Sequence, residues 1–245
     1  MDPGAIEEMS ALEDHHWWFV GKRLLVASLL GHRLERPGLR VLDVGCGTGG
    51  VLASLGGVKA AGVDRSLEAL RHCRRRGLEG LASADGDRLP FAPSRFDVVL
   101  MLDVLEHFRD EAALLAGVRH VLVPGGTLFV SVPAYQFLWS THDEVLHHVR
   151  RYTGARLARV LRANGFTIDR LTYTNVVPLA PAIVVRGLLP RLGLRRDGGT
   201  DFQTHAPWVN RALVAAYRVE AWAVRRVRLP CGLSVAAVAR SVADR

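Results

Sequence analysis

The stretch VLDVGCGTGG, residues 41–50, decides the fold of this chain. It begins as a compact apolar run, and Gly45, Gly47 and Gly49 then follow at alternate positions. Glycine tolerates a positive φ and lets a ligand approach the backbone closely. A helix that starts after such a turn offers free N–H groups to that ligand. The pattern therefore predicts a strand, a nucleotide-binding turn and a helix.

The glycine spacing and the nearby acidic residues distinguish this turn from a dinucleotide-binding turn. The dinucleotide fingerprint is GxGxxG, whereas the spacing here is GxGxG, with Asp43 two residues before the first glycine. A carboxylate is poorly placed beside a pyrophosphate but well placed to accept from an amino group. Asp64 ends a second predicted strand, where it can accept from ribose hydroxyls. Asp85, followed by Gly86, ends a third and can accept from an adenine amino group. These acids predict a positively charged nucleoside.

Strands and single helices alternate outward from this stretch, which indicates βαβ units and a mostly parallel sheet. The expected strands are 39–45, 58–66, 78–87, a run beginning at 96, 127–134, 166–174 and 231–240, and the main expected helices are 66–77, 110–126, 153–166 and 208–228. We divide the chain into a helical N-terminal cover (1–38), an α/β core (39–174), a helical insert or cap (175–230) and a last core strand (231–245).

These motifs resemble those of the class I S-adenosylmethionine-dependent methyltransferases. The HWWF segment near the start and the HDE, HH and RRY residues of 142–152 resemble, more narrowly, the small-molecule type 11 and type 12 kinds. The segments VLDVGCGTG, GVDRS and ADGDRLPF look like the glycine motif, the second-strand acid and the adenine loop, and FDVVLMLDVLEHFRD and LVPGGTLFVSVP look like the fourth and fifth strands. The resemblance implies a doubly wound, Rossmann-like sheet of seven strands, mostly parallel, with an antiparallel last strand. It also implies S-adenosylmethionine at the carboxyl ends of the strands.

The residues expected to bind this cofactor fall in the matched motifs and in the N-terminal cover. Trp18 is expected to close over the donor together with its aromatic neighbours, although clustered aromatic residues also suit a core. Arg23 is expected to meet the carboxylate of the donor. The full set is Asp43, Gly45, Cys46, Gly47, Gly49, Asp64, Arg65, Asp85, Gly86, Leu102, Trp18 and Arg23.

The stretch STHDEVLHHVRRY, residues 140–152, follows the fifth strand and is expected to lie on the acceptor side of the donor. His142, His147 and His148 are the candidate general bases, with His142 the first choice and Asp143 or Glu144 as the orienting carboxylate. Asp103, directly after the fourth strand, is expected to face the methionine end of the donor or the acceptor.

Other interpretations of these residues stay open. Arg150, Arg151 and Tyr152 suit a structural tether between this loop and the sheet edge equally well. Glu106 or His107 as a base is a weaker alternative, because such a position often begins a helix and packs. A metal site in which His142, Asp143 and His147 or His148 supply the ligands is a weaker alternative. No metal is expected, since nothing elsewhere completes a ligand set convincingly.

Composition limits the partners and the location of the protein. The formal charge is +8, and nearly all the positive charge is arginine, which either reflects genome composition or attracts anions. The acidic first residues lack the apolar core of a signal peptide. The three cysteines are scattered, as suits a reducing compartment. We therefore expect a cytoplasmic protein.

The insert is both apolar and rich in arginine, which suits, in order, a substrate lid, a membrane-facing lid or a dimer contact. A small hydrophobic or lipid-linked acceptor is expected, with peripheral contact to the inner membrane face as a possibility. Monomer and homodimer both stay open. RNA methylation is the runner-up because of the charge, but LDVLEH stands where amino-methylating enzymes of nucleic acids carry another motif. A donor-binding protein without turnover is the third alternative.

Overall fold

The computed structural model describes residues 3–188 and 206–242 and confirms the predicted fold. Seven strands form one sheet in the order β3-β2-β1-β4-β5-β7-β6. The last strand, β7, runs antiparallel to both of its neighbours, and the other adjacent pairs are parallel. The strands are β1 (Arg40–Val44), β2 (Lys59–Asp64), β3 (Gly80–Ser83), β4 (Phe96–Leu102), β5 (Leu122–Pro133), β6 (Phe166–Thr174) and β7 (Ser234–Ser241).

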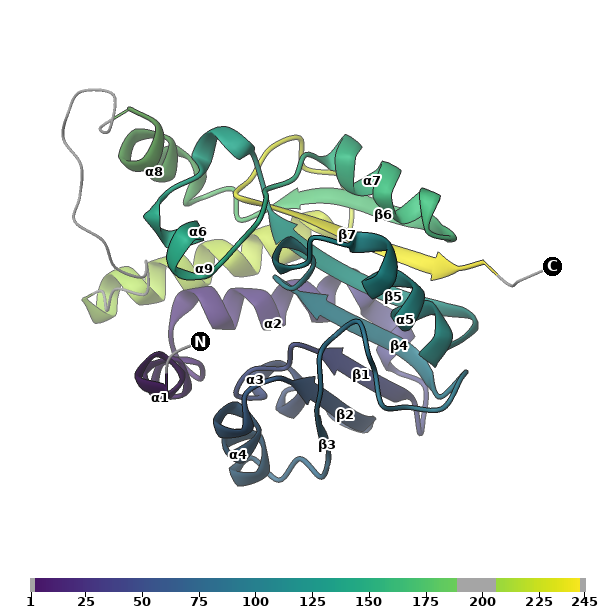
Figure 1. Ribbon diagram of the computed structural model, residues 1–245. Coiled ribbons are helices and arrows are strands. Elements are labelled where there is room, and N and C mark those ends of the chain that lie inside the picture. Colours follow the sequence, from purple (N-terminus) through teal and green to yellow (C-terminus); the bar gives the residue numbers. More distant parts are fainter. Residues whose placement is uncertain (1–2, 189–205, 243–245) are drawn as a thin grey trace.

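Helices cover both faces of this sheet (Figure 1). The α-helices are α1 (Pro3–Leu12), α2 (Trp17–Leu30), α3 (Gly50–Ala53), α4 (Leu67–Arg75), α5 (Glu111–Val121), α6 (Thr141–Val145), α7 (Gly154–Ala163), α8 (Leu179–Ala182) and α9 (Pro207–Val224). Short 3-10 turns span η1 (Gly31–Leu34), η2 (Leu105–His107) and η3 (Gln136–Leu138), and a π-helical segment, η4, spans Ile183–Leu188.

Neighbouring residues of the central strands point to opposite faces of the sheet, and the helices that they contact show which face each helix covers. Val41 and Leu100 belong to a core cluster with residues of α2, α3, α4 and α9, whereas Leu42 and Met101 belong to the cluster that packs on α5 and α7. All four side chains are fully buried. Successive residues of a strand point to opposite faces, so the runs of apolar residues in the central strands supply both cores.

The helix of the insert and the N-terminal cover form one layer rather than two separate coverings. Helix α9 lies alongside α2 on the same face of the sheet (Figure 1). Ser28 donates a hydrogen bond to the carbonyl of Ala221, and the backbone N–H of Trp17 donates to Asn210 at 2.8 Å. A Cβ atom at Gly21 would lie 2.3 Å from the ring of Tyr217. The two helices therefore approach closely because residue 21 has no side chain.

The predicted boundary between the helix 110–126 and the strand 127–134 was wrong. The expected helix 110–126 ends at Val121, and β5 already begins at Leu122, before the Pro-Gly-Gly turn. Asp110 caps the helix as an acceptor for two backbone N–H groups. At the other end, Leu122 pairs with Phe96 and the register then shifts before Val98. Pro and Gly thus interrupt the beginning of a strand rather than end a helix.

The apolar half of the insert is described only in part. The expected segment 176–196 is seen as α8 and η4 up to residue 188, and residues 189–205 lie outside the described residues. Among the described helices, none has the length and apolar character that crossing a bilayer requires.

The close approach of α2 and α9 gives a stability prediction. Replacement of glycine by alanine inside a helix normally stabilises it by roughly 0.5–1 kcal/mol. At Gly21 the new methyl group would overlap the Tyr217 ring, and overpacking costs about 1–3 kcal/mol. We expect Gly21→Ala to lower the free energy of unfolding in urea by about 1–2 kcal/mol.

Gly56→Ala is the matched control, because a Cβ atom there meets nothing within 4 Å. Its unfolding free energy should stay within about 0.5 kcal/mol of the wild type. A Gly21→Ala protein as stable as the wild type would contradict the packing described for α2 and α9.

Candidate functional site

The glycine turn lies between β1 and α3, as predicted. Gly45, Gly47 and Gly49 have φ values of 73°, 53° and 85°, in the left-handed region that favours glycine. The carbonyl of Val63 accepts hydrogen bonds from the N–H groups of residues 45 and 46 at 2.7 and 3.0 Å. A Cβ atom at Gly49 would lie 2.9 Å from Sγ of Cys73. The positive φ disfavours a side chain at all three glycines, and at Gly49 there is also no room for one.

Asp43 presents an unsatisfied acceptor beside the turn. It is 2% exposed, and its Oδ1 atom has no hydrogen-bond partner among the described residues. Burial, and then the nearby carboxylates of Glu13 and Asp64, raise its pKa well above the usual range. A buried acceptor without a donor is costly. The atom therefore fits a ligand that brings an ammonium group or another hydrogen-bond donor.

The Asp64 carboxylate is already held by the backbone. Its Oδ2 atom accepts from the N–H of Gly47 at 2.9 Å, and its Oδ1 atom accepts from the N–H of Ser66 at 2.8 Å. These bonds fix the carboxylate at the end of β2 against the glycine turn. Each oxygen retains a second lone pair, so the geometry is compatible with the expected hydroxyl partners.

The remaining residues predicted for the core of the site have mixed surroundings. Arg65 and Asp85 form an exposed ion pair, with Nε 2.9 Å from Oδ1, that bridges the loops after β2 and β3. Gly86 is buried, and Leu102 lies partly buried against the core on the α2 face. Cys46 is buried with its Sγ 4.0 Å from Sγ of Cys73, which is a packing arrangement.

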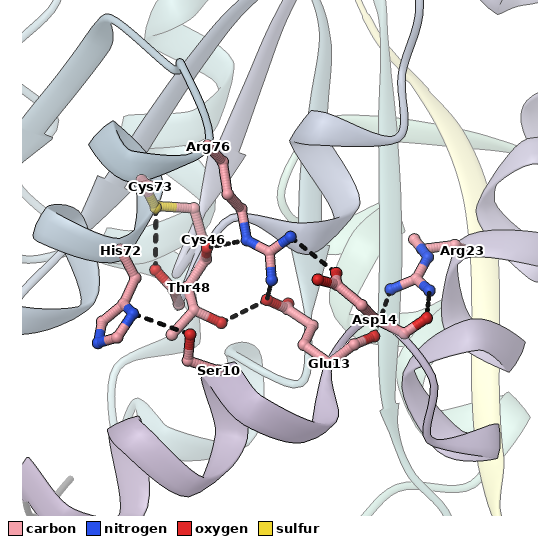
Figure 2. A network of polar contacts seen from close by, with 10 residues as sticks. Ser10, Glu13, Asp14, Arg23, Cys46, Thr48, His72, Cys73 and Arg76 are labelled. Atoms are coloured by element: carbon pink, nitrogen blue, oxygen red, sulfur yellow. Dashed lines mark hydrogen bonds and ion pairs between the residues drawn. The ribbon is translucent and has the colours of Figure 1, made fainter.

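Helix α1 and the residues after it cover the glycine turn (Figure 2). Thr48 donates to Glu13, and Arg76 donates from Nε to the Thr48 carbonyl at 3.0 Å. The same guanidinium donates to Asp14 at 2.7 Å and to Glu13 at 3.3 Å. Sequence reasoning missed Glu13 and Arg76, because they are 63 positions apart and no local pattern links them. Together these contacts clamp the N-terminal segment onto the turn.

Trp18 and Arg23 belong to this cover. Arg23 donates to the backbone carbonyls of Glu13 and Asp14 at 2.6 and 3.1 Å, and so holds the connection between α1 and α2. Trp18 packs edge-on against Trp17, with the ring centroids 5.6 Å apart. The expected contacts of both residues with a cofactor stay predictions.

Asp103 lies at the carboxyl end of β4 in a left-handed conformation, with φ of 55°. Its carboxylate pairs with Lys22 of α2 and accepts from the Ser131 hydroxyl at 3.4 Å. Lys22, which sequence reasoning missed, also lies 5.4 Å from the centroid of the Trp18 ring. A small cavity adjoins the pair and is lined by Leu25, Leu102, Phe129, Ser131, Thr174, Asn175, Ser234 and Ala236.

The block 140–152 is organised around Asp143 rather than His142. Arg151 donates to both carboxylate oxygens at 2.8 Å, and Nδ1 of His148 lies 2.9 Å from Oδ1. Burial alone would raise the pKa of Asp143, but the hydrogen bonds from His148 and Arg151 hold it well below the usual range. Next to Arg151, Tyr152 pairs with the segment that follows β5. The tether and the polar cluster therefore coexist.

The predicted bases are not equivalent. His142 is half-buried, and burial together with the nearby Arg186 lowers its pKa to about 4. His147 is exposed, with φ of 56°, just after α6. The histidine that sits deepest in the block is His148, whose side chain is 6% exposed.

Comparison with known proteins shows the family to which this chain belongs. A family model described as a methyltransferase domain matches residues 20–171. A ubiquinone biosynthesis O-methyltransferase from Thiobacillus denitrificans is 30% identical over 209 residues, which cover 73% of this chain and 89% of that protein. One from Xylella fastidiosa is 36% identical over 110 residues, covering 42% of this chain and 45% of that relative, so the match there spans about half of its length.

Solved structures share the fold at lower identity. A chain of the complex between the Haloferax volcanii Trm112 methyltransferase activator and the putative methyltransferase has a TM-score of 0.61 at 20% identity, covering 99% of this chain and 96% of that one. A SAM-dependent methyltransferase from Thermotoga maritima, described as a possible histamine N-methyltransferase, has a TM-score of 0.60 at 17% identity, covering 97% and 99%. These similarities show the fold.

The clamp on the N-terminal cover predicts a change in local dynamics. Arg76→Gln removes the guanidinium that joins Glu13, Asp14 and the Thr48 carbonyl. We expect amide hydrogens of residues 3–14 to exchange about tenfold faster or more, because local opening no longer breaks these bonds. Arg71→Gln on the same helix is the control, since Arg71 is exposed and pairs only locally with Glu68. Equal exchange in both variants would contradict the clamp.

The lowered pKa of His142 predicts a pH dependence of stability. In the unfolded chain the pKa should be near ~6.5, whereas in the folded chain it is about 4. Between these values only the unfolded chain binds the proton, so the free energy of unfolding falls as the pH falls. Urea unfolding of His142→Gln should therefore lose stability less steeply than the wild type from about pH 6.5 to pH 4. Parallel curves would show that His142 titrates normally.

Proposed function

The chain belongs to the methyltransferase-domain family, and we propose that it transfers the methyl group of S-adenosylmethionine to a nucleophilic atom of a small, hydrophobic acceptor. The observation that carries this proposal is the buried, unsatisfied Oδ1 atom of Asp43 beside three left-handed glycines. An ammonium group would satisfy that atom, whereas a pyrophosphate would be repelled by it. The acids Glu13 and Asp64 close by add to the preference for a cationic ligand.

S-adenosylmethionine, when bound, supplies an electrophilic methyl group on a sulfonium. The bond from sulfur to the methyl carbon breaks as a bond from carbon to the acceptor atom forms, and an O–H, N–H or C–H acceptor also loses a proton. The protein has to align the two reactants and exclude water. In our proposal the glycine turn and Asp64 hold the nucleoside, and α1 with the Glu13–Arg76 contacts covers it. The Lys22–Asp103 pair lines the small cavity and is proposed to orient the acceptor.

The catalytic roles rest on position and protonation. Asp103 is proposed to align the acceptor rather than to accept its proton, because it is already paired with Lys22. His142 is proposed as a base in preference to His147, which is exposed. With a pKa of about 4, His142 is unprotonated at neutral pH but only weakly basic. Its contribution should therefore be small, and an acceptor with an acidic hydroxyl suits this site best.

The proposed acceptor is hydrophobic or lipid-linked. Relatives named ubiquinone biosynthesis O-methyltransferases support a small-molecule acceptor. The insert adds exposed apolar side chains next to arginines, which suits peripheral contact with an anionic membrane face. The apolar side chains are Val177, Ile183, Val184, Val185, Trp208, Val219 and Trp222, and the exposed arginines of α9 and the residue after it are Arg211, Arg218 and Arg225. We therefore propose a peripheral protein that reaches its acceptor at the inner membrane surface.

The test is transfer of a labelled methyl group from S-adenosylmethionine into three separate pools: a lipid extract, a polar metabolite extract and bulk RNA. We expect label in the lipid pool. Label only in RNA would favour the nucleic-acid alternative suggested by the net charge of +8. Binding of the donor without label in any pool would favour a donor-binding protein without turnover.

Lys22→Met sharpens this test, because it removes the partner of Asp103. We expect kcat/KM for the acceptor to fall roughly a hundredfold while donor affinity stays unchanged, since misalignment of the reactants costs about this much. The matched control is Lys59→Met, at the other lysine of the chain, which is exposed at the start of β2. Full activity of Lys22→Met would remove the Lys22–Asp103 pair from the mechanism.

A further inference from the structure

We propose that Glu106, His107 and His148 form a binding site for a divalent transition-metal ion of the zinc type. The sequence alone predicted no metal, because two of these residues come from the 3-10 turn after β4 and the third comes from the loop after α6. The fold brings one ligand atom from each to within 4.8 Å of the others. The site goes beyond the proposed methyl transfer and is tested independently of it.

Glu106 is the first argument for a cation. The residue is 0% exposed, and neither carboxylate oxygen has a hydrogen-bond partner among the described residues. A buried, unpaired carboxylate is strongly unfavourable, so it must hold a proton or a cation. The Nε2 atom of His148 lies 4.0 Å from Oε1 of Glu106, which is too far for a hydrogen bond.

The orientation of His148 is the second argument. Its Nδ1 atom lies 2.9 Å from the Asp143 carboxylate, which is in turn held by two hydrogen bonds from Arg151 at 2.8 Å. The carboxylate therefore accepts a hydrogen bond from Nδ1–H. The Nε2 atom, 4.0 Å from Glu106, then carries the lone pair that can bind a metal ion. Metal-binding histidines commonly donate their second ring N–H to a carboxylate in this way. A histidine that only packed in this loop would not need a buried carboxylate fixed by an arginine.

The spacing of the ligand atoms is the third argument. Ligands ~2.1 Å from zinc at tetrahedral angles lie ~3.4 Å from one another. The observed separations of up to 4.8 Å close to that value when each side chain moves by about 1 Å or less. The rings of His107 and His148 already meet edge-on, with their centroids 4.8 Å apart.

The donor set defines the class of metal. Two imidazoles and one carboxylate suit zinc and its neighbours better than magnesium or calcium, which prefer oxygen ligands. Three protein ligands leave a fourth position open. Glu106 lies close enough to Asp103 and Lys22 to interact electrostatically with both, so the site adjoins the pair that we propose orients the acceptor. An acceptor hydroxyl held there would have a lowered pKa; this last step rests on the proposed function.

The experiment is a titration of the full-length protein, freed of metal by a chelator, with Zn²⁺ by calorimetry and with Co²⁺ by visible absorption. We expect one ion per chain and an intense absorption band typical of four- or five-coordinate Co²⁺. Glu106→Gln and His148→Gln should each weaken binding a hundredfold or more. Asp143→Asn should weaken it about 10–100-fold, because it removes only the support of His148.

His147→Gln is the matched control, because His147 adjoins His148 but is exposed; its affinity should equal that of the wild type. Circular dichroism and thermal melting establish that each variant folds, and His107→Gln replaces any that does not, since His107 is exposed. Absence of saturable binding in the wild type, or unchanged binding in the folded ligand variants, would overturn the site. If the wild type binds no metal, the buried Glu106 carboxyl group holds a proton instead.

The measurement is made without S-adenosylmethionine and needs no acceptor. Absence of metal binding would therefore overturn the metal site but not the proposal of methyl transfer. Absence of methyl transfer would overturn that proposal but not the metal site. Donor affinity of Glu106→Gln, measured in parallel, should match that of the wild type. A parallel loss of metal and donor binding would mean that the variant disturbs the fold of the site and would count against a dedicated metal ligand.

Discussion

The left-handed turn after β1, with a buried carboxylate directly before it, is the constraint on which the rest of the site depends. Three glycines adopt positive φ there, and the packing around Gly45 and Gly49 leaves no room for a Cβ atom. Two residues of β2 hold the turn in place: the carbonyl of Val63 and the carboxylate of Asp64 both accept hydrogen bonds from its backbone N–H groups. With this backbone held open, Asp43 keeps an oxygen without a donor. The turn is thus prepared for a ligand that brings positive charge.

The cover over this turn makes access to the site depend on a few polar contacts. Glu13 is 6% exposed and is joined to Thr48 and Arg76, so α1 cannot lift without exposing or breaking these bonds. On the same face α9 packs against α2, and the Lys22–Asp103 pair projects from that layer toward the end of β4. The two sequence segments outside the α/β core therefore pack together as one layer on this face of the sheet.

Local patterns predicted the fold, and long-range contacts decided the details of the site. The strand runs, the glycine spacing and the acids at strand ends were readable because each depends on neighbouring residues. The expected end of the helix 110–126 was wrong because Leu122 already pairs with Phe96 of β4, a contact that the local sequence does not reveal. Glu13 with Arg76, Lys22 with Asp103 and Glu106 with His148 each join distant segments. No periodicity marks such pairs, so only the structure revealed them.

Calorimetric titration of the purified protein with S-adenosylmethionine, S-adenosylhomocysteine and NAD tests the central claim most directly, when it is repeated with Asp43→Asn. The account predicts binding of the first two ligands and not of NAD, with donor affinity reduced at least tenfold in Asp43→Asn, because a hydrogen bond to a charged group is worth about 1.5–3 kcal/mol. Binding of NAD in place of both sulfur nucleosides, or full donor affinity in folded Asp43→Asn, would contradict it.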